Sequence, residues 1–261
     1  MDMEGKVAIV TGGAQGIGAA LARALHREGA KHVCVCDLSE DKARAVAEEI
    51  GGTGLRVDVR DGAQITAMID RIEAAYGPVD LMCSNAGIAN GFDPQIVNAA
   101  GAPDEAWQAA WEVNVMAHIH AARVLVPRMI TRGSGYFLHT VSAAGLLSQI
   151  GSATYSTTKH AAVGFAENLA ISHRDQGIRV SILCPQGVAT PMLSGIGAEG
   201  PQAGDGVLTP EEVADAAIAG IRAEQFLILP HPQVQGYMEA KASNYGRWIG
   251  GMAKFQRSFK A

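Results

Sequence analysis

The sequence predicts an α/β fold, in which a doubly wound parallel sheet of about seven strands carries helices on both faces. Short, nearly continuous apolar runs rich in β-branched residues alternate with segments of helical periodicity along the whole chain. Such runs are typical of strands that are buried on both faces of a parallel sheet. The first run, residues 6–11, leads through a glycine-rich turn directly into a helical segment. We therefore expect one domain over residues 1–261.

Each expected helix begins or ends at a recognisable signal. Asp61 with Gln64 three residues later predicts a capping box, and Ser39 is expected to cap the helix that runs to residue 50. A long helix is expected over about 104–132, with a kink at Pro127. The expected strands are residues 6–11, 32–36, 55–59, 79–84, 136–141, 178–184 and 226–229, and further helices are expected at 19–28, at 155–174, from 209 and within the tail 231–261.

The turn after the first strand has the composition of a dinucleotide-binding loop. Gly12, Gly16 and Gly18 lie in it with the spacing G-x-x-x-G-x-G. Glycines let the backbone turn tightly and approach a diphosphate, and the following helix N-terminus offers free N–H groups and the positive end of its dipole. Because the spacing differs from G-x-G-x-x-G, an ordinary glycine turn stays open as an alternative on spacing alone.

Asp37 favours the dinucleotide interpretation. It follows the second strand, nineteen residues after Gly18, where a carboxylate can accept hydrogen bonds from the adenosine ribose. The same carboxylate would repel a 2′-phosphate, and no Arg or Lys occupies the glycine turn or the positions just after Asp37. We therefore expect NAD rather than NADP. Asp58 is expected to reach the adenine amino group, and the turn at residues 85–87 is expected in the same crevice.

Tyr155 and Lys159 form the candidate catalytic pair. They are four residues apart, which places both side chains on one face of a helix. An ammonium group beside a phenol favours the phenolate, so we expect Lys159 to lower the pKa of Tyr155. A tyrosine tuned in this way can exchange a proton with an alcohol or carbonyl oxygen. Ser142, thirteen residues upstream of Tyr155, could hold the same oxygen.

The composition excludes several classes of protein. The net charge of −5 argues against a nucleic-acid or anionic-membrane partner. No apolar run approaches the ~18 residues of a membrane-spanning helix, and the short acidic N-terminus is not expected to be a signal peptide. Cys34, Cys36, Cys83 and Cys184 lie in or at the end of apolar runs, so we expect buried free thiols, no metal site and a reducing, cytoplasmic location.

Taken together, the glycine turn at 11–18, the Asn-Ala-Gly turn at 85–87, Asn114, Ser142 and the pair Tyr155-x-x-x-Lys159 resemble the short-chain dehydrogenase/reductase family. The resemblance extends from residue 5 to about 229. It implies a single Rossmann-type domain that binds NAD and carries the catalytic residues. It also implies a homodimer or homotetramer built on the long helix around Asn114 and the helix of Tyr155.

The resemblance also implies residue roles. Tyr155 would be the acid/base and Lys159 would lower its pKa and bind the nicotinamide ribose. Ser142 would polarise the substrate oxygen, and Asn114 would break its helix locally and hold a water in a proton relay to Lys159. The implied cofactor contacts are Gly12, Gln15, Gly16, Ile17, Gly18, Asp37, Leu38, Asp58, Val59, Asn85, Gly87, Tyr155, Lys159, Val188 and Thr190. The sequence Pro185-Gln186-Gly187 departs from the family, which more often has glycine directly after the proline.

The substrate prediction depends on the residues around the loop at about 186–208. The candidate pocket residues are mainly apolar: Ala144, Leu146, Leu147, Gln149, Gln186, Met192, Leu193 and Ile196. We select Ser142, Ala144, Gln149, Tyr155, Gln186 and Met192 as substrate contacts. A neutral, mainly apolar secondary alcohol or ketone is therefore expected. Two alternatives stay open: a non-catalytic NAD-binding sensor or scaffold, and an NADP-preferring carbonyl reductase.

Overall fold

The structure, a computed structural model, describes residues 1–93, 95–196 and 203–258, with the side chains of residues 195 and 196 left out. Seven parallel strands form one sheet in the order β3-β2-β1-β4-β5-β6-β7. The strands are β1 (Val7–Thr11), β2 (His32–Asp37), β3 (Thr53–Arg56), β4 (Leu81–Ser84), β5 (Gly135–Thr140), β6 (Ile178–Leu183) and β7 (Leu227–Ile228). The strand order reverses between β1 and β4, which opens a crevice at the carboxyl ends of these strands.

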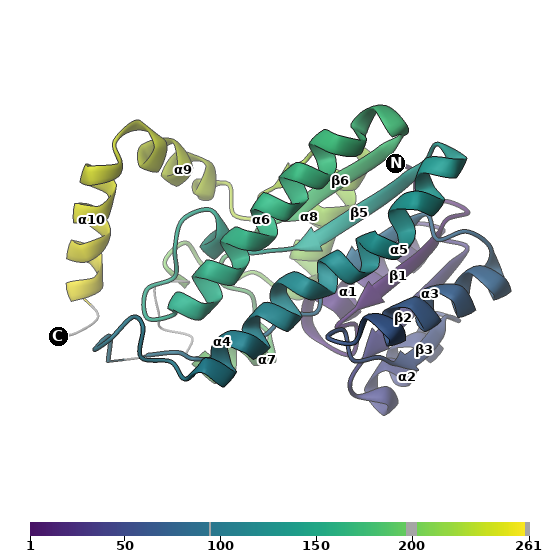
Figure 1. The fold of residues 1–261 in the computed structure, drawn as a ribbon, viewed down its shortest axis with the longest axis horizontal. Coiled ribbons are helices and arrows are strands. Elements are labelled where there is room, and N and C mark those ends of the chain that lie inside the picture. Colours follow the sequence, from purple (N-terminus) through teal and green to yellow (C-terminus); the bar gives the residue numbers. More distant parts are fainter. Residues whose placement is uncertain (94, 197–202, 259–261) are drawn as a thin grey trace.

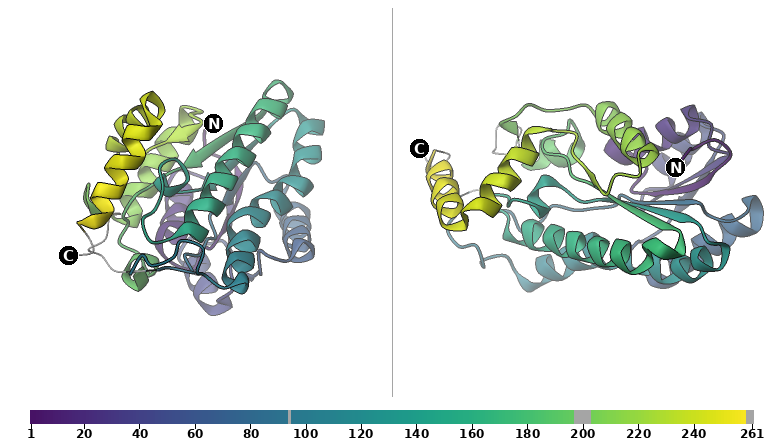
Figure 2. Two further views of the ribbon diagram at one scale, coloured as in Figure 1. Left: turned by 60° about the vertical axis from the view of Figure 1, so that its left-hand side comes forward. Right: turned by 90° about the horizontal axis from the view of Figure 1, so that it is seen from above.

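Helices cover both faces of this sheet. One face packs against α1 (Gly16–Arg27), α2 (Glu40–Glu49) and α8 (Pro210–Arg222), and the other against α3 (Gly62–Tyr76), α5 (Ala117–Arg132) and α6 (Ala153–His173). Figure 2 shows the two helix layers with the sheet between them. Two separate clusters of buried apolar side chains, one on each face, form the core. The doubly wound parallel fold that the sequence predicts is confirmed.

The remaining helices lie toward the carboxyl ends of the strands. They are α4 (Asp104–Trp111), α7 (Pro191–Ile196), α9 (Gln233–Ser243) and α10 (Tyr245–Arg257). Three short helical segments, Glu112–Met116, Ala143–Gly145 and Arg174–Gln176, complete the described helical structure. In Figure 1 the arrow of β5 points toward the side of the molecule that carries α9 and α10. This end of the fold holds all the predicted functional residues.

Several local predictions differ from the structure. The third strand is Thr53–Arg56, so Val57–Val59 form the turn after it instead of its end. The expected helix over 104–132 is divided by a π-helical segment at Glu112–Met116, while Pro127 lies within α5. Ser39 precedes α2 but its side chain makes no capping hydrogen bond. Asp61 does cap α3, yet the Gln64 side chain bonds the Asp58 amide rather than closing a capping box.

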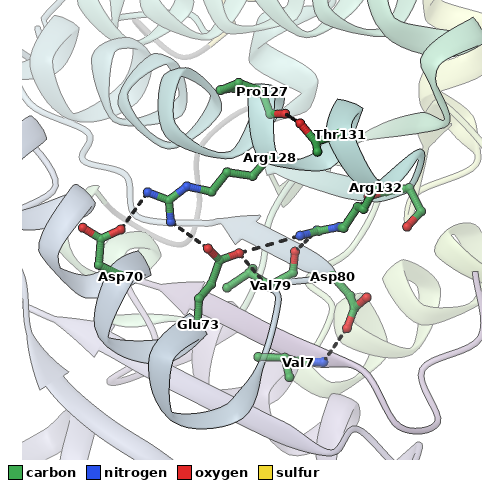
Figure 3. A network of polar contacts seen from close by, with 10 residues as sticks. Val7, Asp70, Glu73, Val79, Asp80, Pro127, Arg128, Thr131 and Arg132 are labelled. Carbon is green, nitrogen blue, oxygen red and sulfur yellow. Dashed lines mark hydrogen bonds and ion pairs between the residues drawn. The ribbon is translucent and has the colours of Figure 1, made fainter.

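A polar network ties the opposite, amino end of the sheet together (Figure 3). Arg128 on α5 binds Glu73 at 2.6 Å and Asp70 at 2.7 Å, both on α3. Asp80, just before β4, accepts a 2.9 Å hydrogen bond from the amide of Val7 in β1. These contacts join α3, α5 and the starts of two central strands. They hold the helices and the central strands together at the end of the sheet that is remote from the predicted site.

Candidate active site

The glycine turn has the close packing that a diphosphate-binding loop needs. A Cβ on Gly18 would lie 2.1 Å from the carbonyl oxygen of Gly12, and Gly12 itself has a φ of +63°. Asn85 donates from its side-chain amide to the carbonyls of Thr11 (3.1 Å) and Gly12 (3.2 Å). Asn85 therefore holds the turn in place, and larger residues at these glycines would displace it.

The first turn of α1 is open to an anion. Gln15 occupies the N-cap position but makes no side-chain capping hydrogen bond, and the first turn contains no acidic residue. The helix N-terminus therefore keeps its positive dipole end and amide donors for a ligand. Thr190 reaches over this turn from the loop after β6, since a Cβ on Gly16 would lie 3.0 Å from its methyl carbon. The residues present fit a dinucleotide diphosphate.

Two acidic residues lie at the adenosine end of the crevice. Asp37 accepts backbone hydrogen bonds from Ala14 at 3.2 Å and Ser39 at 3.1 Å. Asp58 forms a bidentate pair with Arg60, at 2.9 Å to Nε and 2.6 Å to Nη2, and this arginine lowers the pKa of the Asp58 carboxyl. Arg60 lines the same cavity, which the sequence reasoning missed. Its proximity in sequence to Asp58 was the signal that could have revealed it.

Ser142, Tyr155 and Lys159 converge on one wall of the cavity. Ser142 follows β5, and its hydroxyl lies near that of Tyr155. The Ser142 oxygen accepts a hydrogen bond from the Ala144 amide at 3.1 Å, and the hydroxyl donates to the Pro185 carbonyl at 3.4 Å. Lys159 lies one turn after Tyr155 on α6, with its Nζ 5.6 Å from the centroid of the tyrosine ring. The lysine Nζ also donates to the Thr140 carbonyl at 3.0 Å.

The pKa values of this pair differ from expectation. Burial raises the pKa of Tyr155, and the hydrogen bond with Ser142 only partly offsets that increase. Burial also lowers the pKa of Lys159 to about 8. Desolvation is therefore the main influence on both pKa values, and it favours the neutral form of each side chain.

Asn114 lies in the π-helical segment that interrupts the α-helix between α4 and α5, at the place where the resemblance implies a local break. Its side-chain oxygen accepts from the amide of Ile88 at 2.9 Å, and its Nδ2 donates to the carbonyl of Ile88 at 2.9 Å and to Thr158 at 3.1 Å. Asn114 is completely buried and is not among the residues that line the cavity. The side chain thus fastens the loop after β4 to α6.

A cavity of about 900 Å³ brings most of the predicted residues together. The predicted site residues that line it are Gly12, Gln15, Gly16, Ile17, Asp37, Leu38, Asp58, Val59, Asn85, Gly87, Ser142, Ala144, Gln149, Tyr155, Lys159, Gln186, Val188, Thr190 and Met192. Leu147 and Leu193 line it as well, Gly18 and Asn114 lie behind its wall, and Leu146 packs in a small apolar cluster. The side chain of Ile196 lies outside the described residues.

The part of the cavity beyond Ser142 has residues that the sequence reasoning did not select. Phe92, Tyr237, Trp248, Met252 and Phe255 line it. The last three belong to α10, about a hundred residues after Tyr155. Their spacing of four and three residues on a helix is the signal that could have identified them.

Gln186 occupies the position at which the sequence departs from the family pattern. Its amide donates to the ring of the buried His231 at 3.2 Å. Its side-chain oxygen is buried without a hydrogen-bond partner and the residue lines the cavity. The unusual Pro-Gln-Gly order thus adds a polar group to the substrate side of the cleft.

The four cysteines are free and buried, as predicted. Cys184 lies close to the candidate catalytic pair, and burial raises the pKa of its thiol to about 12. Among residues 1–93, 95–196 and 203–258, no group of histidines, cysteines and carboxylates could hold a metal ion. No described helix is both long and apolar enough to cross a membrane.

Comparison with known proteins identifies the family. The family model described as short chain dehydrogenase matches residues 6–200. The chain belongs to this family. A 1-deoxy-11-beta-hydroxypentalenate dehydrogenase from Streptomyces avermitilis is 31% identical over 90% of this chain and 88% of its own. Secoisolariciresinol dehydrogenase from Forsythia intermedia is 35% identical over 73% of this chain and 68% of its own.

A solved structure agrees with this membership. A short chain dehydrogenase/reductase from Burkholderia phymatum in complex with NAD superposes with a TM-score of 0.82. The two chains are 27% identical in sequence, and the superposition covers 94% of this chain and 96% of the Burkholderia chain. The short-chain dehydrogenase described here is therefore an oxidoreductase with the fold of an NAD-binding relative.

Proposed function

We propose that this short-chain dehydrogenase transfers a hydride between NAD(H) and a neutral, mainly apolar secondary alcohol or ketone. The observation that carries the proposal is the convergence of Ser142, Tyr155 and Lys159 on the cavity that also contains the glycine turn. Proteins of the family named for hydroxylated compounds, such as 1-deoxy-11-beta-hydroxypentalenate dehydrogenase, support the reaction class. NAD, when bound, supplies the hydride acceptor.

The chain's own residues would control the proton. Ser142 donates a hydrogen bond that orients the substrate oxygen, and the Tyr155 hydroxyl gives its proton to that oxygen during ketone reduction. The raised pKa of Tyr155 keeps the phenol protonated, which suits this direction directly. Alcohol oxidation requires the phenolate, and the Lys159 ammonium near the ring would favour that form electrostatically.

The preference for NAD rests on Asp37. Its carboxylate lies at the adenosine end of the cavity, where it can accept from ribose hydroxyls and repel a 2′-phosphate. Arg60 favours a second candidate, an NADP-preferring carbonyl reductase, because it places a guanidinium in the same region. Asp58 pairs with that guanidinium, which reduces its attraction for a phosphate.

The proposal is tested by steady-state kinetics with a panel of secondary alcohols and ketones, each with NAD(H) and NADP(H). We expect the absorbance of NADH to change as at least one alcohol or ketone is converted. We also expect kcat/KM to be higher with NAD(H) than with NADP(H). A higher kcat/KM with NADP(H) would favour the reductase candidate. Binding of NADH without turnover of any alcohol or ketone would favour a sensor or scaffold instead.

A further inference from the structure

The helix α10 contributes a wall to the cavity although it lies at the end of the molecule. Trp248, Met252 and Gln256 are its partly buried residues, and every other residue from 245 to 257 is exposed. Trp248 and Met252 line the cavity together with Phe255. Figure 1 shows α10 standing apart from the main body of the fold, connected through α9. The inner face of α10 therefore faces the cavity rather than the sheet.

The preceding helix, α9, fixes α10 to both sides of the cavity. Lys241 donates to the carbonyls of Leu146 at 2.7 Å and Leu147 at 3.1 Å, in the segment that follows Ser142. Tyr237 donates to Asp205 at 2.9 Å, in the segment that follows α7. Asp205 and Leu147 both line the cavity. The bonds of α9 thus connect two walls that are far apart in sequence.

The contacts of Trp248 lead back to the candidate catalytic residues. Trp248 packs against an apolar cluster in which Ala143, Leu147 and Val234 are buried. Ala143 is the residue directly after Ser142. A substrate whose hydroxyl lies at Ser142 and Tyr155 would therefore extend along this cluster toward α10.

The chemistry of this wall is apolar and extended. From Trp248 to Phe255 the helix advances about 10 Å, which is longer than a single six-membered ring. Phe92 lines the cavity from the loop after β4, and Asp205, the one acidic residue among the described lining residues of this part, is bonded to Tyr237. Arg247, Lys254 and Arg257 are exposed on α10 and do not line the cavity.

We propose that Trp248 and Met252 are specificity-determining residues that select secondary alcohols or ketones with an extended apolar ring system. The inference rests on the proposed function, since it assigns the substrate class of the same site. The oxygen-bearing ring is bound at Ser142 and Tyr155, and the remaining rings lie against the inner face of α10. Burial of these rings against large apolar side chains supplies the binding free energy.

The test compares cyclohexanol, a decahydronaphthol and a perhydrophenanthrenol as substrates with NAD. We expect kcat/KM to rise by about tenfold or more from the first to the last, because each additional ring buries apolar area. Trp248→Ala and Met252→Glu are expected to remove that gain, so that within each variant the three alcohols have kcat/KM values within about threefold of one another.

Ile249→Glu is the matched control. Ile249 is 60% exposed on the same helix and is not among the lining residues. Its replacement by Glu therefore introduces the same negative charge as Met252→Glu, but outside the cavity. This variant is expected to keep the gain. Circular dichroism of each variant checks that the fold is retained, and Met252→Glu, at a partly buried helix position, serves if Trp248→Ala does not fold.

The outcomes separate this inference from the proposed function. If cyclohexanol and the fused alcohols are oxidised with equal kcat/KM, or if the gain survives in Met252→Glu, the role of α10 is wrong while the dehydrogenase function stands. If no alcohol is oxidised, the proposed function fails. Binding of the fused alcohol to the NADH complex, measured by thermal shift in wild type and Met252→Glu, then decides the inference. Equal shifts in the two proteins overturn it, and loss of the shift in Met252→Glu supports it.

Discussion

The two halves of the cavity are built in different ways. The dinucleotide half is formed by turns that leave the carboxyl ends of β1, β2, β3 and β4, and its shape follows from the central sheet. The substrate half is formed by the loop after β4, the segment around α7 and the helices α9 and α10. The first half is thus fixed by the fold, whereas the second is assembled from segments that contact each other mainly through side chains. Substitutions should therefore affect cofactor binding and substrate choice separately.

The largest effect on cofactor binding is expected from Gly18→Ala in the dinucleotide half. The added Cβ would lie 2.1 Å from a backbone oxygen and 2.6 Å from the Asn85 amide, so the turn must shift. We expect the Kd of NADH to rise by about 100-fold or more, as measured by fluorescence titration. Gly236→Ala, on α9 with nothing within 4 Å of the added carbon, is the control and should leave the Kd unchanged.

The next effect is expected from Asp37→Ser at the adenosine end. Loss of hydrogen bonds to a charged acceptor should lower kcat/KM for NAD by about 10- to 100-fold, and loss of the negative charge should raise kcat/KM for NADP. Steady-state kinetics with both cofactors at saturating alcohol measures both changes. An unchanged ratio between the two cofactors would remove Asp37 from the account of cofactor choice.

Lys159 lies where the two halves meet, and its burial affects stability. Its pKa of about 8 lies below the usual 10.5, so between these pH values the unfolded chain binds the additional proton. Stability from this group therefore increases as pH rises through that window. Relative to Lys159→Met, the free energy of unfolding of the wild type should increase by about 2 kcal/mol between pH 7.5 and 10. Urea denaturation at both pH values measures it, and a constant difference would contradict the burial of a charged lysine.

The smallest effect is expected in the substrate half, from Met192→Ala. Met192 lines the cavity but is 39% exposed, so its truncation removes little buried area. We expect KM for an apolar alcohol to change by about threefold with no change in the KM for NAD. Equal changes in both constants would show that the two halves are not independent.

The same contrast explains what the sequence could predict. The glycine turn, Asp37 and the pair Tyr155 and Lys159 depend on local spacing and on strand ends that parallel pairing brings together, so they could be read from the chain. The parallel fold was predictable for the same reason. The strand ending at Arg56 instead of residue 59 was not, because a buried turn has the same apolar composition as a strand.

Long-range side-chain contacts account for what the sequence did not reveal. The position of α10 depends on Lys241 reaching carbonyls that are more than ninety residues away in sequence. The pKa of Tyr155 is raised mainly by burial, and the i,i+4 spacing of Tyr155 and Lys159 does not reveal how deeply the tyrosine is buried. Likewise, the sequence did not reveal that Asn114 bonds Ile88 and Thr158, which lie 26 and 44 residues away along the chain.

The proton-exchanging role of Tyr155 is tested most directly by Tyr155→Phe, which removes one hydroxyl and keeps the ring. The variant and the wild type are compared in kcat for the best alcohol of the panel and in Kd for NADH. We expect kcat to fall by about 10²- to 10⁴-fold while the Kd stays within about threefold. Turnover by Tyr155→Phe at the wild-type rate would contradict the mechanism.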